Sequence, residues 1–260
     1  MKKIYTLLAI VLICFAAQDV NAAKVRVGEK NNETTTPADR FVFAAKAGFN
    51  LGGTAPMGLP AEIRAINSFK PTFSFSIAGT AQYNFNNKWG LQSGIKFDVK
   101  GMKTDATVKN YQLSLFQEGA KRPTEGVFTG NVITKVHNSY ITIPLLAVYN
   151  ISPRWDIKFG GYASFMVDGE FSGKAYDGYM REGDPTGNNT GTIEATYDFS
   201  EDMRKVDAGV QVGVDFIPYK HLLISGDLTW GCLPIFKSDF TAMSFNMYNV
   251  YFNIGFGYVF

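Results

Sequence analysis

Apolar and polar residues alternate over long stretches of this chain, a pattern typical of β-strands that bury one face. The clearest stretch is VDAGVQVGVDF at 206–216, where valine, alanine and phenylalanine take every even position. The last twelve residues, NVYFNIGFGYVF, alternate in the same way up to Phe260. Six more such stretches lie at 41–51, 73–85, 89–100, 140–151, 155–167 and 222–230. The pattern predicts eight strands, each near or above the ~9 to 11 residues that a tilted strand needs to cross a bilayer.

The connections between these strands alternate in length. Three are tight turns, at 86–88, 152–154 and 218–220, and four are long and polar, at 52–70, 104–136, 169–204 and roughly 234–246. Short turns at one end and long loops at the other are typical of an outer-membrane barrel, with periplasmic turns and extracellular loops. Pro144 interrupts one strand and predicts a bend or bulge there.

The face opposite the apolar residues decides between a soluble and a membrane barrel. A soluble barrel turns its apolar face inward, but here the other face carries charges that would be costly in a closed core. In a narrow lumen they can pair with each other and with water. We therefore predict an all-β fold, an eight-stranded antiparallel up-and-down transmembrane β-barrel with its apolar face outside. Its predicted lumenal charge network comprises Lys46, Lys96, Asp98, Lys100, Asp156, Lys158, Asp207, Asp215 and Asp227.

The interior of an eight-stranded barrel is just wide enough for side chains, so an open diffusion pore is not expected. We favour a plug of ion pairs. The alternative is a narrow ion path along five of the same residues, namely Lys46, Lys96, Asp98, Asp207 and Asp215.

Aromatic residues gather at the strand ends that adjoin the three short turns and the C-terminus. A general preference of aromatic side chains for strands explains their number but not this clustering. We predict that they form an interfacial girdle on the periplasmic side. Its members are Tyr83, Phe85, Trp89, Tyr149, Trp155, Phe216, Tyr258 and Phe260.

The N-terminus reads as a secretory signal peptide over residues 1–22, with Lys2 and Lys3 ahead of an apolar run and Ala22 at the cleavage point. A polar, flexible periplasmic leader follows at 23–40, and the barrel spans 41–260. Removing the signal takes two lysines and one aspartate from 25 basic and 23 acidic residues, which leaves 23 and 22. A nearly neutral chain does not indicate nucleic-acid binding. Cys232 is then the remaining cysteine, expected as an inert thiol that is buried or faces lipid.

Candidate chemistry is sparse, and we predict no enzyme, no cofactor and no metal site. The one catalytic alternative is His137 with Ser139, two residues apart on the outward face at the extracellular start of a strand. This placement resembles the His-x-Ser pair of lipid A deacylases, which are also eight-stranded barrels. Such a serine needs the histidine as base and a carboxylate to orient it, and the sequence does not identify that carboxylate.

Several segments together resemble the PorT-like outer-membrane β-barrel family of Bacteroidetes. They are AKAGFNL, FSIAGTAQYNFNNKWGLQSGIKFDVKGMK, YITIPLLAVYN, VDAGVQVGVDF and NIGFGYVF, so the likeness runs from about residue 41 to 260. The resemblance implies an eight-stranded barrel in the outer membrane, mostly of unassigned role, with one branch associated with protein secretion. It supplies no catalytic motif.

Three functions remain open. The first is a non-enzymatic structural or surface-binding barrel that acts through its extracellular loops. The second is an accessory subunit of an outer-membrane secretion or transport assembly, and the third is a lipid A-modifying hydrolase. Expected partners are outer-membrane lipid, possible secretion or transport components, and the barrel-assembly machinery, whose recognition signal the aromatic C-terminal strand resembles.

Overall fold

The computed structural model of the protein describes residues 40–117 and 124–260. The predicted signal peptide and all but the last residue of the predicted leader lie outside these ranges. Among the described residues, no helix is long and apolar enough to cross a membrane. The described chain is dominated by antiparallel β-structure.

Eight strands form a closed ring, as the alternation predicts. Neighbours in the ring follow chain order, and β10 pairs with β1 from Val259 opposite Ala44 to Met247 opposite Pro56. The C-terminal strand therefore closes the barrel. The ring strands are β1 (Phe41–Pro56), β3 (Phe75–Asn84), β4 (Trp89–Gln117), β5 (Thr124–Ser152), β6 (Trp155–Glu182), β8 (Val206–Tyr219), β9 (Leu222–Gly231) and β10 (Met247–Val259).

The three short turns lie where the sequence predicts them, between β3 and β4, β5 and β6, and β8 and β9. Of the bend or bulge predicted at Pro144, the bulge is wrong. The β4–β5 register is the same on both sides of the proline, with Ser93 opposite Leu145 and Lys96 opposite Thr142. Proline has no N–H to donate to β4, but the Ser93 hydroxyl donates to the Pro144 carbonyl at 2.8 Å. This contact helps to keep the strands together without a register shift.

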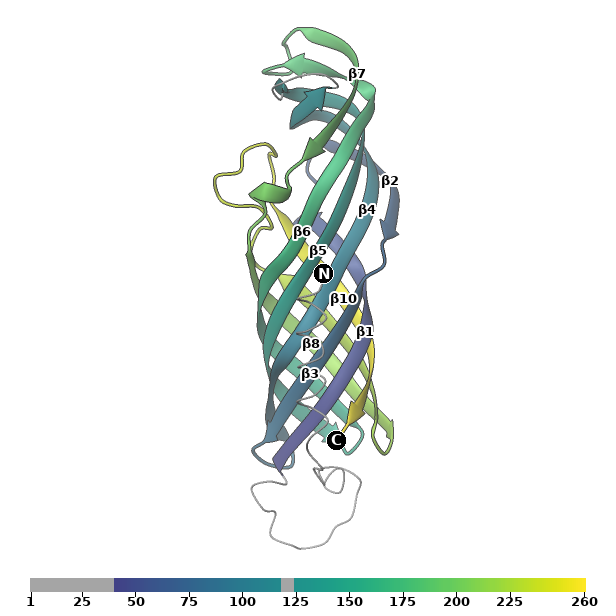
Figure 1. Cartoon of the computed structure of the whole chain (residues 1–260), viewed down its shortest axis with the longest axis vertical. Coiled ribbons are helices and arrows are strands. Elements are labelled where there is room, and N and C mark those ends of the chain that lie inside the picture. The colour runs from purple at the N-terminus through teal and green to yellow at the C-terminus, as the bar shows by residue number, and fades with distance from the viewer. Residues whose placement is uncertain (1–39, 118–123) are drawn as a thin grey trace, which may run out of the picture.

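The predicted long loops are wrong in three of the four cases, because much of their sequence forms strands. β4 and β5 continue through most of 104–136, and β6 continues to Glu182. Segment 52–70 contains most of β2 (Ile63–Pro71), and 169–204 contains β7 (Asn189–Asp198) and the 3-10 helix η3 (Ser200–Asp202). Figure 1 shows the result, a curved sheet of β2, β4, β5, β6 and β7 that rises far above the other strands. We call this part the extension and the closed part below it the barrel.

The two parts are joined by continuous strands, and the polar and apolar side chains of these strands change faces between the barrel and the extension. On β4 the inward even positions change from Lys96, Asp98 and Lys100 in the barrel to Met102 and Val108 in the extension. The outward odd positions change in the opposite sense, from Ile95 and Phe97 to Lys103 and Asp105. No parity change is needed, so the pleat continues while the polarity of its two faces is inverted.

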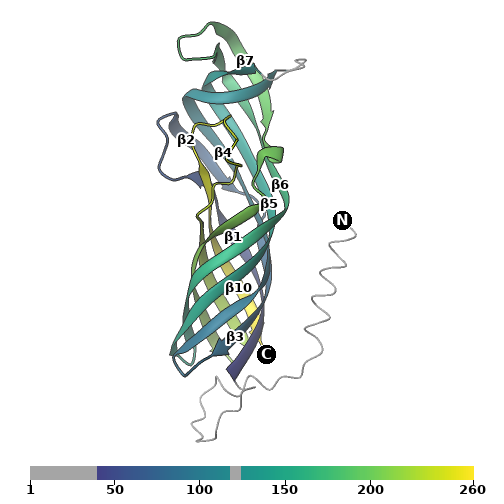
Figure 2. The same ribbon diagram turned by 90° about the vertical axis from the view of Figure 1, so that its left-hand side faces the viewer.

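The concave side of the extension holds the main apolar core of the described chain. Its fully buried residues include Phe128, Phe171 and Met180 from β5 and β6. The segment between β9 and β10 folds against this side, where the Phe236 ring lies 4.9 Å from that of Phe171. The Ile235 N–H donates to the Met247 carbonyl at 2.9 Å. Figure 2 shows this segment, in yellow, folded beside the sheet above the barrel mouth.

Candidate binding cavity above a filled lumen

The lower lumen contains a cluster of four predicted charges. Lys46 Nζ lies 2.9 Å from the Asp215 carboxylate. Lys158 Nζ lies 2.7 Å from Asp215 and 2.9 Å from Asp227, so one lysine joins two carboxylates. The Gln211 amide donates to Asp227 at 3.1 Å. Because β1, β6, β8 and β9 each contribute a charge, the cluster ties opposite sides of the ring together.

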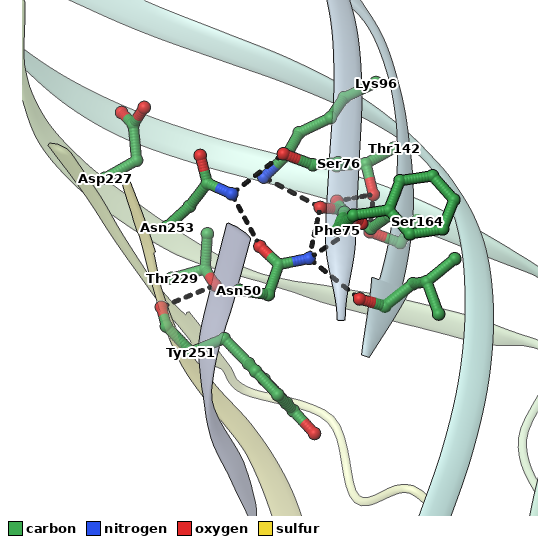
Figure 3. A network of polar contacts seen from close by, with 12 residues as sticks. Asn50, Phe75, Ser76, Lys96, Thr142, Ser164, Asp227, Thr229, Tyr251 and Asn253 are labelled. Carbon is green, nitrogen blue, oxygen red and sulfur yellow. Dashed lines mark hydrogen bonds and ion pairs between the residues drawn. The ribbon is translucent and has the colours of Figure 1, made fainter. Parts of the chain in front are cut away.

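A second network of polar contacts involves β1, β4, β5 and β10 (Figure 3). The Asn253 amide donates to Asn50 at 2.7 Å, and the Asn50 amide donates to Asp98 at 3.3 Å. Asp98 also pairs with Lys96 at 2.9 Å and accepts a hydrogen bond from the Thr142 hydroxyl at 3.1 Å. The Asp98 side chain thus has an ion-pair partner and two neutral donors, which together compensate the cost of burying its charge.

Lys100 differs from its predicted role. It is 2% exposed, yet among the described residues it has no carboxylate within ion-pair distance. Its Nζ instead lies over three aromatic rings, 5.1 Å from the centroid of Tyr140, 5.4 Å from Tyr251 and 5.7 Å from Tyr162. Attraction between the ammonium charge and the ring faces replaces a direct ion pair.

The remaining predicted charges, Asp156 and Asp207, are also buried. Asp207 accepts hydrogen bonds from the Tyr162 hydroxyl at 3.3 Å and the Asn249 amide at 3.0 Å. Asn249 in turn accepts one from the Thr54 hydroxyl at 2.9 Å. These contacts join most of the buried lumenal side chains to one another, although Asp207 Oδ1 and the Tyr251 hydroxyl have no hydrogen-bond partner among the described residues, and this arrangement favours a plug over an ion path.

The predicted girdle residues lie beside the turns in interacting pairs. Trp89 and Tyr149 are cross-strand partners with ring centroids 4.9 Å apart, and Trp155 and Phe216 are partners at 4.3 Å. The rings of Tyr83 and Phe85 are 5.5 Å apart, and those of Tyr258 and Phe260 are 5.2 Å apart. Their role at a membrane interface stays a prediction.

His137 and Ser139 lie in the middle of β5 rather than at its start, because the strand begins at Thr124. Their partners on β6 are Glu170 and Asp168, respectively. Within the described residues no hydrogen bond connects the His137 and Ser139 side chains, and Glu170 accepts its bond from Ser172. The nucleophile, base and carboxylate contacts of a hydrolase are therefore not assembled.

An apolar cavity of about 360 Å³ lies where the extension meets the barrel mouth. β1, β2, β4, β5, β6 and the start of β10 all contribute to its wall, together with the segment that precedes β10. The sequence pattern does not predict this cavity, because most of its lining residues lie in segments expected to be loops. The signal was the alternation in MKTDATVK at 102–109, which continues that of the preceding strand. Six of its apolar lining residues are Met102, Ala106, Val108, Val132, Phe171 and Phe245.

Few polar groups reach this cavity. Thr134 contributes a hydroxyl that is already bonded to the Tyr197 hydroxyl at 2.6 Å. Tyr111 also lines the wall, and burial raises the pKa of its phenol well above the ordinary value. Within the described residues, no hydrogen bond engages the Thr104 hydroxyl or the Tyr111 hydroxyl. The site suits an apolar molecule with one hydrogen-bonding group.

Among the described residues, no group of three or more His, Cys, Asp or Glu side chains is placed to hold a metal ion. Cys232 follows directly after β9 and is exposed, so the buried alternative is wrong, and contact of this thiol with lipid stays a prediction.

Comparison with protein families gives a match over residues 17–237 to the outer membrane protein β-barrel domain. The chain belongs to this family. Its location is therefore the cell outer membrane. Comparison with curated protein sequences gives no match.

The chain is also similar, at low identity, to several solved structures. The attachment invasion locus protein Ail of Yersinia pestis, solved with the heparin analogue sucrose octasulfate, is 13% identical, with a TM-score of 0.36 and coverage of 85% of this chain and 99% of Ail. Neisserial surface protein A is 11% identical, with a TM-score of 0.31 and coverage of 84% and 96%. OprG from Pseudomonas aeruginosa is 14% identical, with a TM-score of 0.32 and coverage of 84% and 95%.

Proposed function

We propose that this family member is a non-enzymatic surface-binding protein, whose extension faces the cell exterior and binds a small apolar molecule in its cavity. The observation that carries this proposal is the cavity itself, about 360 Å³ in volume and lined mainly by apolar side chains. Binding pockets for small molecules have volumes of ~300 to 1,000 Å³ and a few polar groups that orient the ligand. Thr104 supplies such a group.

The filled lumen supports binding rather than passage. Below the cavity, the Lys100 side chain and its tyrosine rings occupy the barrel, and the ion-paired cluster around Lys158 lies on the same inward face. A ligand that crossed the barrel would have to separate these buried pairs, which is costly. The cavity is therefore the end point of binding in this proposal.

A neutral apolar fluorophore, N-phenyl-1-naphthylamine, tests the proposal on purified protein in detergent. Ala106→Trp places a large ring into the cavity, whereas Ala65→Trp adds the same ring to the outward face of the extension. We expect saturable fluorescence for the wild type and Ala65→Trp, and a loss of at least tenfold in affinity for Ala106→Trp. Equal binding by all three proteins would contradict the proposal.

An accessory role in a secretion or transport assembly is a second candidate, favoured by the edge of the extension. β2 pairs only with β4 among the described strands, so its other edge can accept a partner strand. Large apolar side chains are exposed beside it, including Met57 at 64% and Phe73 at 75%. Crosslinking in intact outer membranes, followed by mass spectrometry, tests this role, since reproducible links from β2 to one assembly are expected.

The closer likeness to the PorT-like branch and recognition of β10 by the barrel-assembly machinery stay predictions.

A further inference from the structure

Three lysines stand side by side on the outward face where the extension begins. Lys70 on β2 is the direct partner of Lys103 on β4, and Lys103 is the direct partner of Lys135 on β5. All three side chains are exposed. Like charges placed directly opposite each other on neighbouring strands destabilise a sheet. An anion bound beside the row would reduce this repulsion.

The protein does not supply that anion from its described residues. None of the three lysines has an ion pair or side-chain hydrogen bond there. Lys174 on the same face is compensated, because its Nζ lies 2.6 Å from the Glu194 carboxylate.

The nearby carboxylates are engaged with other partners. Asp105 accepts hydrogen bonds from the Tyr176 hydroxyl at 2.8 Å and the Asn67 amide at 3.3 Å. Glu170 accepts one from the Ser172 hydroxyl at 2.8 Å, and Asp198 accepts one from the backbone N–H of Ser200 at 2.9 Å. These carboxylates keep their negative charge, and Asp198 also lines the hollow described next, but among the described residues none of them forms an ion pair with the row.

A hollow of about 570 Å³ lies beside this row. Lys103, Lys135 and Lys174 contribute to its rim, and Gly173 lies in its lining. The Gly173 backbone lies against the Tyr197 ring, and a Cβ atom at position 173 would collide with that ring. The hollow adds room for a bulky anionic group next to the exposed ammonium groups.

The height of the row points to a lipid headgroup. On β4 the last apolar side chain at an outward position is Val99, which its neighbours cover to 6% exposure, and Lys103 follows four positions later. At ~3.3 Å per residue and a strand tilt near 45°, this separation is about 9 Å along the barrel axis. The headgroup layer occupies roughly the first 5 to 8 Å beyond the hydrocarbon core, and lysine side chains can extend back toward it.

We propose that Lys70, Lys103 and Lys135 form a binding site for the phosphate groups of an outer-leaflet glycolipid of the lipid A type. The phosphates neutralise the like-charged row, and the hollow receives part of the sugar headgroup. The site lies on the outward face, opposite the apolar cavity, and does not depend on the function proposed for that cavity.

The first test measures lipid binding by native mass spectrometry on the purified full-length protein. The probes are lipid A with both phosphates and lipid A with both removed. Since each lysine near an anionic lipid surface contributes about fivefold in affinity, Lys103→Gln with Lys135→Gln should weaken binding of the phosphorylated probe roughly 25-fold. Binding of the dephosphorylated probe should not change.

The control is Lys88→Gln with Lys109→Gln, which removes the same charge from a turn and from a higher point on β4. Unchanged affinity in this control is expected. Equal weakening in both double variants, or no weakening in either, would overturn the proposal.

A second test uses the sign of a stability change, and it also detects folding defects. In zwitterionic detergent alone, the Lys103 and Lys135 double variant should unfold at a higher temperature than the wild type, because the repulsion is gone. Phosphorylated lipid A should reverse that order. If millimolar inorganic phosphate stabilises the wild type as much as the lipid does, the site binds free phosphate and the lipid assignment is wrong.

Discussion

Three strands, β4, β5 and β6, run through both the barrel and the extension, yet the two parts place polar and apolar side chains on opposite faces. In the barrel, β4 turns Asp98 and Lys100 inward and Ile95 outward, whereas in the extension it turns Met102 and Val108 inward and Lys103 outward. The surroundings of each part explain the difference. The barrel has lipid outside and a narrow lumen inside, and the extension has water outside and a packed core inside.

This inversion is where we expect the membrane boundary to lie. It falls between Lys100 and Met102 on β4, and at the matching positions Asn138 and Val136 on β5. β6 makes the same change next to an irregularity at 166–168, where its register with β5 shifts by one residue. The level at which the faces exchange is thus consistent across three neighbouring strands, and the lysine row lies just above it.

The largest expected effect comes from removing the central cation of the lower lumen. Lys158→Ala leaves Asp215 and Asp227 without their shared partner in a buried site. The expected loss in the free energy of unfolding is about 3 to 5 kcal/mol, measured by urea unfolding in lipid vesicles. Lys174→Ala, which breaks an exposed pair in the extension, should cost about 1 kcal/mol or less. Similar losses would show that the two environments do not differ as described.

Truncation of a core aromatic should affect the extension alone. Phe128 is fully buried there, so Phe128→Ala is expected to destabilise the packing of the extension by about 3 to 5 kcal/mol. Limited proteolysis should then cut the extension while the barrel keeps its heat-dependent mobility on gels. Phe159→Ala removes a ring that faces outward from the barrel, and it should change neither readout strongly. Loss of the folded barrel in Phe128→Ala would show that the two parts unfold together.

An arginine added to the outer face of each part should also distinguish the barrel from the extension, with a smaller change in the free energy of unfolding. Val212 is 52% exposed in the middle of β8, and Val212→Arg should cost about 2 to 4 kcal/mol because this face meets lipid. Ala65→Arg on the outer face of the extension should stay within about 0.5 kcal/mol. Both values come from urea unfolding in vesicles. An equal tolerance for arginine at both positions would mean that the apolar outer face does not contact lipid.

The smallest expected effect is a pH response at the tip of the extension. Hydrogen bonds from the Thr186 hydroxyl and backbone N–H, at 2.6 and 2.7 Å, lower the pKa of Asp184 below its ordinary value of 3.8. A lowered folded pKa stabilises the turn above pH ~4, and the contribution is lost as the pH falls through the folded value. A carboxyl titration followed by NMR should therefore show a midpoint below 3.8. Asp184→Asn should remove the pH response, and a midpoint above 3.8 would contradict the hydrogen bonds described.

Much of the barrel was predictable from the sequence because its determinants are local. A period of two residues identifies strands, tight turns join neighbours, and the charged face must avoid lipid. The eight ring strands, the three turns and the inward charges follow from these rules. The same rules failed to predict the strands within 104–136. There the inward face becomes apolar, and no long apolar outward face indicates a strand.

The tertiary structure alone decided the features that depend on which strands become neighbours. The position of Lys100 over three tyrosine rings combines residues from four strands, β4, β5, β6 and β10. The row of Lys70, Lys103 and Lys135 exists because β2 pairs with β4 at that register. The cavity likewise requires β1, β4 and the segment before β10 to meet at the barrel mouth. Alternation along one strand shows which way a side chain points, but only pairing and closure determine what it meets.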